Sequence, residues 1–260
     1  MVYGLVCKED LTLARFDRSV QGWNSILDKL LICRSTAEGQ ALIERLARWD
    51  GVCILTFVNA HALNLAWDEH EYQQLLADAD VLLRDGVGAS LLMRLTGREP
   101  GLNMNGTDFI PELLKGLPRD RKVAVYGTAE PYLEKMVSHL KAMGFAQIDA
   151  EDGFHQDEYY VAQYLKCRPA VLLLAMGMPK QERVSSLLRS VARDDSVLII
   201  NGGAIVDFVA NRFPRAPVWV RKSGLEWLFR FIQEPRRLWR RNLGYVVFVL
   251  RALLVHFSVR

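Results

Sequence analysis

The stretch from Val171 to Glu182 reads VLLLAMGMPKQE, and it indicates the fold more clearly than any other part of the chain. Six apolar residues run directly into a glycine, and a proline and the polar trio Lys180, Gln181 and Glu182 follow soon after. An apolar run of this length that ends in a turn is typical of a buried parallel strand leading into a helix. The trio either begins a solvated helix or faces a ligand, and its position alone leaves both interpretations open.

The same alternation recurs along the chain. Short apolar runs are each followed by a segment of helical periodicity, which predicts βαβ units and a parallel sheet covered by helices on both faces. We therefore predict an α/β fold, a Rossmann-like parallel sheet flanked by helices, with a basic C-terminal helical appendage. One helical segment is predicted to run unbroken over 58–80. The predicted strands are VCILTF (52–57), DVLLRD (80–85), KVAVYG (122–127), AVLLLAMG (170–177) and SVLIINGG (196–203).

The composition is that of a soluble globular protein. Of the 260 residues, 50% are hydrophobic and 24% are charged. The four cysteines are scattered without a CxxC pair, which favours reduced thiols in a cytosolic protein over a disulfide scaffold or a zinc site. The N-terminus gains acidic residues within its first ten positions and makes a poor signal peptide.

The net charge of +3 conceals an uneven distribution of charge. The segment from Arg212 to Arg260 holds 11 basic and 2 acidic residues, which leaves 22 basic and 28 acidic residues in the rest of the chain. We predict a core over 1–211, whose first 50 residues have no readable role, and an appendage over 212–260. A basic segment of this kind suggests an anionic partner.

The ends of the predicted strands indicate where a ligand would bind. In an open parallel sheet, ligands bind outside the carboxyl ends of the strands. Each of these ends carries glycine or a small polar residue; glycine lets a phosphate approach the backbone, and the start of the next helix favours negative charge. The sequence therefore predicts a pocket for an anionic ligand at 56–59, 84–88, 126–128, 177–182 and 201–203.

Several familiar motifs are missing from the sequence. There is no Walker A motif, no complete GxGxxG and no GxSxG elbow, which weighs against a P-loop nucleotidase, a dinucleotide enzyme and a hydrolase. The five histidines lie apart and form no HExxH. Asp78 and Asp80 form a DxD, but they precede their strand and would lie at the wrong edge of the sheet, so no metal site is predicted.

One carboxylate follows a predicted strand directly. Asp85 stands between DVLL and GVG, where it would look into the predicted pocket and could act as a general base. It also stands just before a helix, where aspartate is a favoured N-cap. Position alone favours the cap.

Several longer segments of the sequence resemble those of a known protein family. The segments TFVNAHALNLA, LRDGVGASLLMRLTG, NGTDFIPELL, VAVYGTAE, LLAMGMPKQE, INGGAIVDFVA, RAPVW and GLEWLFRFIQEPRRLWRR follow one another between Val52 and Arg241. In this order they resemble the bacterial glycosyltransferases of the WecG/TagA/CpsF type. The resemblance implies an inverting, metal-independent transfer of a sugar from a UDP-sugar to a saccharide carried on polyprenyl diphosphate, in the synthesis of cell-surface polysaccharides. It implies no cofactor and leaves the sugar open among N-acetylmannosamine, its uronic acid and glucose.

The resemblance also assigns roles to single residues. Asp85 matches the aspartate that is the family's proposed general base, which raises that role above the N-cap. Gln181 and Asn59 match pocket residues, whereas Thr56 stands one position before the family's threonine. Charge on the departing diphosphate would need Lys180, backbone N–H groups at glycine-led helix starts, and arginines of the appendage. The substrate-binding residues expected are Thr56, Asn59, Asn103, Thr107, Gly127, Gly177, Lys180, Gln181, Arg215, Arg221 and Arg230.

The end of the chain combines a basic cluster with an apolar run. The run is interrupted by Arg251 and is shorter than the roughly 20 residues of a membrane-spanning helix. We expect residues 236–257 to lie on the inner face of the cell membrane, with Arg236 and its basic neighbours near anionic headgroups. A helix packed on the core or in a subunit interface is the alternative, and a homo-oligomer is left open. We expect no nucleic-acid partner, because the charges alternate with apolar residues.

Two other functions are compatible with such a fold. One is a nucleotide- or dinucleotide-dependent oxidoreductase on the same kind of sheet, and the other is a non-catalytic binding module tethered to the membrane. The appendage is further expected to fold over the active site and complete it.

Overall fold

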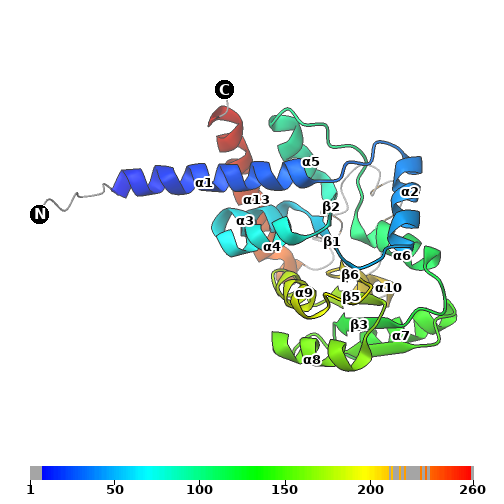
Figure 1. Cartoon of the computed structure of the whole chain (residues 1–260). Helices are drawn as coiled ribbons and strands as arrows, with labels where there is room; N and C mark the ends of the chain where they lie inside the picture. Colours follow the sequence, from blue (N-terminus) through cyan, green and yellow to red (C-terminus); the bar gives the residue numbers. More distant parts are fainter. Residues whose placement is uncertain are drawn as a thin grey trace, which may run out of the picture.

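The computed structural model describes residues 8–210 and 235–258 together with positions 212, 217, 220, 229 and 232, and it gives only the backbone for 8–13 and 235–242. The described strands form one six-stranded sheet in the order β2-β1-β6-β5-β3-β4, and all their pairings are parallel (Figure 1). The predicted α/β fold is confirmed. The strands are β1 (Val52–Val58), β2 (Val81–Arg84), β3 (Val123–Gly127), β4 (Ile148–Glu151), β5 (Val171–Ala175) and β6 (Val197–Asn201).

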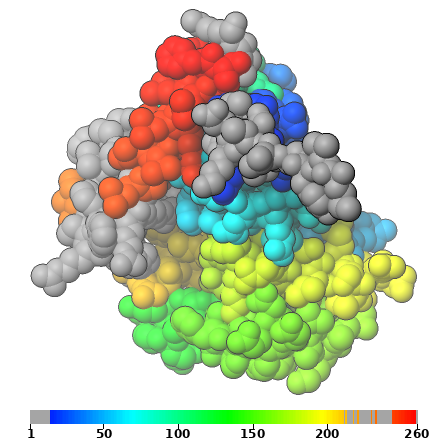
Figure 2. Space-filling view, turned by 90° about the vertical axis from the view of Figure 1, so that its left-hand side faces the viewer, coloured from blue at the N-terminus to red at the C-terminus, as the bar shows by residue number. Residues whose placement is uncertain are grey.

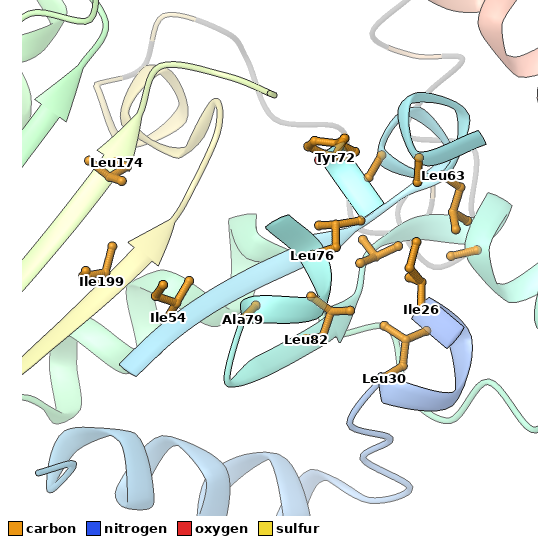
Figure 3. Packing of buried hydrophobic residues seen from close by; sticks show 14 of the residues in the cluster. Ile26, Leu30, Ile54, Leu63, Tyr72, Leu76, Ala79, Leu82, Leu174 and Ile199 are labelled. Atoms are coloured by element: carbon orange, nitrogen blue, oxygen red, sulfur yellow. The ribbon is translucent and has the colours of Figure 1, made fainter. Parts of the chain in front are cut away.

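Helices cover both faces of the sheet, because alternate strand residues point to opposite sides. Ile54, Leu82 and Ile199 belong to the core on one face (Figure 3), and Leu55, Leu83 and Ile200 belong to the core on the other. The first face is covered by α1 (Lys8–Lys29), α3 (Ala60–Asp68), α4 (His70–Asp78), α5 (Gly86–Leu95), α8 (Asp157–Cys167), α9 (Lys180–Val191) and α13 (Pro235–Ser258). The second is covered by α2 (Thr36–Ala47), α6 (Gly106–Gly116), α7 (Tyr132–Ala142) and α10 (Ile205–Val209).

Two details of the chain differ from the sequence prediction. The edge strand β4 was not predicted, because its sequence IDAE is short, half polar and only partly buried. The helix predicted over 58–80 is divided into α3 and α4 at Glu69, whose backbone is extended. The side chain of Gln73 donates to the carbonyl of Ala66 (2.6 Å) across this break, which satisfies a carbonyl that a continuous helix would have used.

The last described helix, α13, packs against α3 and α5 (Figure 2). Gly88 of α5 makes the close approach possible, because a Cβ there would lie 2.8 Å from Ala60 Cβ and 3.4 Å from Phe248 Cε1. Trp23 of α1 joins the same contact: its ring lies 5.6 Å from that of Phe248, and its Nε1 donates to Leu63 O (2.6 Å). The predicted C-terminal helix therefore exists, and the beginning of the described chain helps to hold it.

Candidate active site

A cavity of about 730 Å³ opens at the carboxyl ends of four neighbouring strands, β2, β1, β6 and β5. Four of the five junctions expected at a binding site contribute to it, and the junction after β3 does not. The position is that expected for a ligand site on an open parallel sheet. The residues that line it from these junctions include Phe57, Asn59, Asp85, Gly177, Gln181, Asn201 and Gly203, and α6 adds Gly106 and Thr107.

Asp85 stands where β2 ends and α5 begins, and it lines the cavity. Its backbone N–H donates to Val58 O (2.8 Å), which ties the end of β2 to the end of β1. Although Asp85 occupies the N-cap position, its side chain makes no capping hydrogen bond. The carboxylate is therefore not used in the way that the alternative interpretation required.

The backbone around Asp85 is held by two side chains. Arg84 is only 5% exposed and donates to the carbonyls of Gly86 (2.9 Å), Pro100 (2.9 Å) and Gly101 (3.1 Å). Burial lowers the pKa of this guanidinium below its usual range. Asn103 Oδ1 accepts from Gly86 N (2.7 Å). Asn103, which was expected to bind substrate, thus holds the turn that carries Asp85 and is not among the cavity-lining residues.

Gln181, from the first turn of α9, lies in the floor of the cavity. Its Oε1 accepts from Gly203 N (2.9 Å), and its Nε2 donates to Glu182 Oε1 (2.8 Å). Glu182 lies behind this floor and is 1% exposed, and burial raises its pKa to about 7.

A second buried polar group lies beside this floor. Asn201, at the end of β6, donates from Nδ2 to Thr56 Oγ1 (2.8 Å) and to Ser185 Oγ (3.1 Å). Its Oδ1 is buried without a hydrogen-bond partner among the described residues. Asn201 lines the cavity, whereas Thr56 is fully buried beneath it. Thr56 therefore orients Asn201, and sequence reasoning had not singled out Asn201 as a side chain of the site.

Asn59, Thr107 and Gly177 line the cavity as expected. Asn59 also caps α3, because its Oδ1 accepts from His61 N (3.0 Å) and Ala62 N (3.1 Å). Gly177 has a φ of +81°, a left-handed conformation that favours glycine, and a Cβ added there would meet no atom within 4 Å. The turn after β5 thus leaves open space at the cavity.

Lys180 and Gly127 were expected in the site but do not line the cavity. The Lys180 ammonium donates to the carbonyls of Gly153 (2.9 Å) and His155, which binds it to the loop between β4 and α8. Gly127 allows β3 and β5 to approach, since a Cβ there would lie 2.3 Å from the backbone of Ala175. Of the polar trio after β5, only Gln181 is thus a cavity-lining residue. The other three expected residues, Arg215, Arg221 and Arg230, lie outside the described residues.

The C-terminal helix α13 forms one wall of the cavity, through Gly244, Val247 and Arg251. Arg251 donates to Asp68 Oδ1 (2.6 Å) and Oδ2 (3.0 Å) and to Asn64 Oδ1 (3.1 Å). Asn64 Nδ2 in turn donates to the carbonyl of Gly244 (2.6 Å). Arg251 was not predicted as a site residue, because in the sequence it only interrupts an apolar run.

Comparison with known proteins identifies the family of the chain. The model of the Glycosyl transferase WecG/TagA/CpsF family matches residues 28–260. The chain belongs to the WecG/TagA/CpsF family. Its residues outside the match are 1–27, so α13 and its wall of the cavity lie within the family's common region.

Two curated relatives of this WecG/TagA/CpsF protein carry the same name, N-acetylglucosaminyldiphosphoundecaprenol N-acetyl-beta-D-mannosaminyltransferase. The protein of Bacillus subtilis (strain 168) is 27% identical over 209 residues, which cover 77% of this chain and 78% of the relative. The protein of Bacillus spizizenii (strain ATCC 23059 / NRRL B-14472 / W23) is 28% identical over 193 residues, which cover 72% and 74%.

As a WecG/TagA/CpsF protein, the chain is a glycosyltransferase of polysaccharide biosynthesis, and the enzyme prediction is confirmed. The oxidoreductase and the binding module are not favoured. Within the described ranges, no group of three or more His, Cys, Asp or Glu residues could hold a metal ion. Asp80, the second aspartate of the DxD, accepts hydrogen bonds from Ile54 N (2.7 Å) and from Arg189. Its carboxylate is therefore already hydrogen-bonded within the protein.

Proposed function

We propose that the protein transfers a sugar from a UDP-sugar to a saccharide on polyprenyl diphosphate, with inversion and without a metal ion. Both relatives are named for a diphosphoundecaprenol-linked N-acetylglucosamine acceptor and for transfer of N-acetylmannosamine, which supports this class of substrates. The observation that carries the proposal is the placement of Asp85. Asp85 lines the cavity and its side chain makes no capping hydrogen bond, while Arg84 and Asn103 hold the backbone next to it.

The proposed reaction needs one base and a stabilised leaving group. Asp85 takes the proton from the acceptor hydroxyl while the hydroxyl oxygen attacks the anomeric carbon from the face opposite the nucleotide. The bond between the anomeric carbon and the diphosphate oxygen breaks, and UDP leaves with the electron pair. Donors fixed in advance stabilise the charge that develops on the diphosphate. We assign this role to Gln181 at the floor of the cavity and to Arg215, Arg221 and Arg230 of the appendage.

The appendage over 212–260 is proposed to complete the site and to bring it to the inner face of the cell membrane. In α13, Phe248, Ala252 and Val255 are buried against the core. Apolar side chains on its other faces are exposed, and such a surface on an interfacial helix binds the boundary between headgroups and acyl chains. Within the part of the chain that the structure describes, no helix has the length and apolar character required to cross a bilayer. The exposed residues are Leu243, Val246, Val247, Val249, Leu250, Leu253, Leu254 and Phe257.

Thermal unfolding with a panel of UDP-sugars tests the proposed donor. A ligand that binds only the folded protein raises the melting temperature once its concentration exceeds its dissociation constant. We expect a shift with UDP and with one UDP-sugar, unchanged by EDTA, and release of UDP when a polyprenyl-diphosphate-linked N-acetylglucosamine is added. A shift with NAD(P)H and none with UDP would overturn the proposal in favour of the oxidoreductase. Loss of the shift in EDTA would overturn metal independence alone.

A truncation tests the role of the appendage. We expect deletion of the residues from Gly224 onward to abolish transfer, because it removes the α13 wall of the cavity. It should also abolish binding to vesicles that contain anionic lipids. Full activity of the truncated protein would contradict the proposed completion of the site.

A further inference from the structure

Glu182 is a buried acidic residue that the proposed reaction does not use. Its Oε1 accepts from Gln181 Nε2 (2.8 Å), and its Oε2 is buried without a hydrogen-bond partner among the described residues. A buried carboxyl group with an unsatisfied oxygen costs free energy, and a polar side chain is retained at such a place when its contacts have a function or a structural purpose. Its side-chain partner Gln181 lines the cavity, whereas Glu182 itself does not.

The contacts of Gln181 fix both ends of its amide. Gly203 N–H can only donate, so the group that faces it at 2.9 Å must be the amide oxygen. The amide nitrogen then faces Glu182 Oε1 and uses one of its two N–H bonds there. Gly203 therefore determines which end of the amide is oxygen, and Glu182 determines where the nitrogen lies. The second N–H of Gln181 is not used in this contact, and Gln181 lines the cavity.

We propose that Glu182 is a positioning residue, which holds the Gln181 amide nitrogen so that its remaining N–H donates to an oxygen of the bound ligand. The proposal rests on the proposed function, which supplies the diphosphate and sugar oxygens that such a donor recognises. Glu182 acts through Gln181 and does not touch the substrate. Its neighbours Ser185 and Asn201 support the same floor, because Ser185 Oγ donates to Glu182 O (2.9 Å) and accepts from Asn201 Nδ2.

A double-mutant cycle in the full-length protein separates positioning from simple packing. Glu182→Leu removes the acceptor for Gln181, and Glu182→Gln keeps one in its amide oxygen. With UDP as the titrated ligand, we expect Glu182→Leu to weaken binding at least about fivefold and Glu182→Gln to stay within about twofold of wild type. In a Gln181→Ala background, Glu182→Leu should have no further effect. Unchanged affinity in Glu182→Leu, or a loss that adds fully to that of Gln181→Ala, would overturn the proposal.

A readout without ligand keeps this inference distinct from the proposed function. In ¹⁵N-labelled protein, the side-chain amide resonance of Gln181 is identified by its absence from Gln181→Ala. We expect this resonance to move in Glu182→Leu and to stay close to its wild-type position in Glu182→Gln; a resonance that stays in place in Glu182→Leu would overturn the proposal. Glu182→Met replaces the leucine variant if that variant does not fold. If wild-type protein does not bind UDP but the resonance responds as expected, the proposed donor is wrong and the positioning role stands.

Discussion

Arg251 of α13 pairs with both carboxylate oxygens of Asp68 at the end of α3, at 2.6 Å and 3.0 Å. The two residues lie far apart in the sequence, and both line the cavity. The Arg251 guanidinium also lies 5.5 Å from the centre of the Trp67 ring. One arginine therefore attaches the last described helix to the first helix of the sheet's βαβ series and closes the cavity on that side.

We expect Arg251→Gln to lower transfer activity about tenfold or more while costing at most about 1 kcal/mol of stability, because Asp68 is half exposed and such pairs are screened by water. Thermal unfolding and a transfer assay measure the two effects. Arg251→Lys keeps the charge but cannot form the bidentate pair with Asp68, so its activity should lie between those of wild type and Arg251→Gln. Full activity in Arg251→Gln would show that this pair does not hold the cavity wall.

Asp85→Asn removes the base with little change of shape. We expect kcat to fall about 10²- to 10⁴-fold, the range over which general bases contribute, while UDP still raises the melting temperature. Thermal unfolding of the free variant checks that any loss of turnover is not a loss of folded protein. Replacement of Asp78 by asparagine, at the opposite edge of the sheet, is the matched control and should leave kcat unchanged. Retained turnover in Asp85→Asn would remove Asp85 from the mechanism.

Burial of Glu182 makes stability depend on pH. Its pKa is raised from 4.5 to about 7, mainly by desolvation. Between these values the unfolded chain has lost the proton that the folded chain keeps, so folding is favoured at low pH and stability falls as the pH rises through this window. The change is on the order of 3 kcal/mol if the group titrates alone.

Glu182→Gln should remove this dependence, because its amide does not titrate. The difference in unfolding free energy between the variant and wild type should therefore grow in favour of the variant from about pH 5 to pH 8. Denaturant unfolding at a series of pH values measures it. A difference that stays constant over this range would show that the carboxyl group does not titrate there.

Gly88 sets the distance between α5, α3 and α13. In Gly88→Ala the new Cβ would meet Ala60 Cβ at 2.8 Å and Phe248 Cε1 at 3.4 Å, so the helices must move apart. We expect a loss of about 1–3 kcal/mol, as is typical of overpacking, together with reduced activity, because α5 carries Asp85 at its start.

The matched control is Gly39→Ala in α2. Its Cβ would approach only the flexible end of Met104, at 3.3 Å, and alanine favours a helix. This variant should be neutral or slightly stabilised in thermal unfolding. Equal effects of the two substitutions would show that space at Gly88 is not what matters.

The sequence predicted the sheet well, because continuous apolar strands and glycine at their ends are local signals. β4 was missed, since an edge strand that is only partly buried lacks the apolar run. Side-chain direction was predicted less well. Lys180 and Gln181 are adjacent in the sequence, yet α9 directs one to the carbonyls of the β4–α8 loop and the other to the cavity. Successive residues of a helix point about 100° apart. Which of the three polar residues after β5 faces the cavity therefore depends on the residue at which α9 begins, and the sequence did not give that residue.

Side-chain contacts between residues that lie far apart in the sequence could not be predicted, because no local pattern in the sequence indicates them. Arg251 appeared only as a charge within an apolar run, and its partner Asp68 only as a residue inside the helix predicted over 58–80. Asn103 was expected to bind substrate only through the family resemblance, and in the structure its side-chain oxygen accepts from Gly86 N. Thr56 appeared to face the ligand, although alternation along β1 and the position of Asn201 place it below the floor.

The contact between Trp23 and Phe248 has a consequence for synthesis. Proteins are made from the N-terminus, so α1 and α3 leave the ribosome long before the helix that packs on them. Until then the Trp23 ring lacks its contact with Phe248, and the cavity lacks the wall that Gly244, Val247 and Arg251 supply. If α13 completes the site as proposed, a nascent chain that has not yet reached α13 should form its sheet and still be inactive.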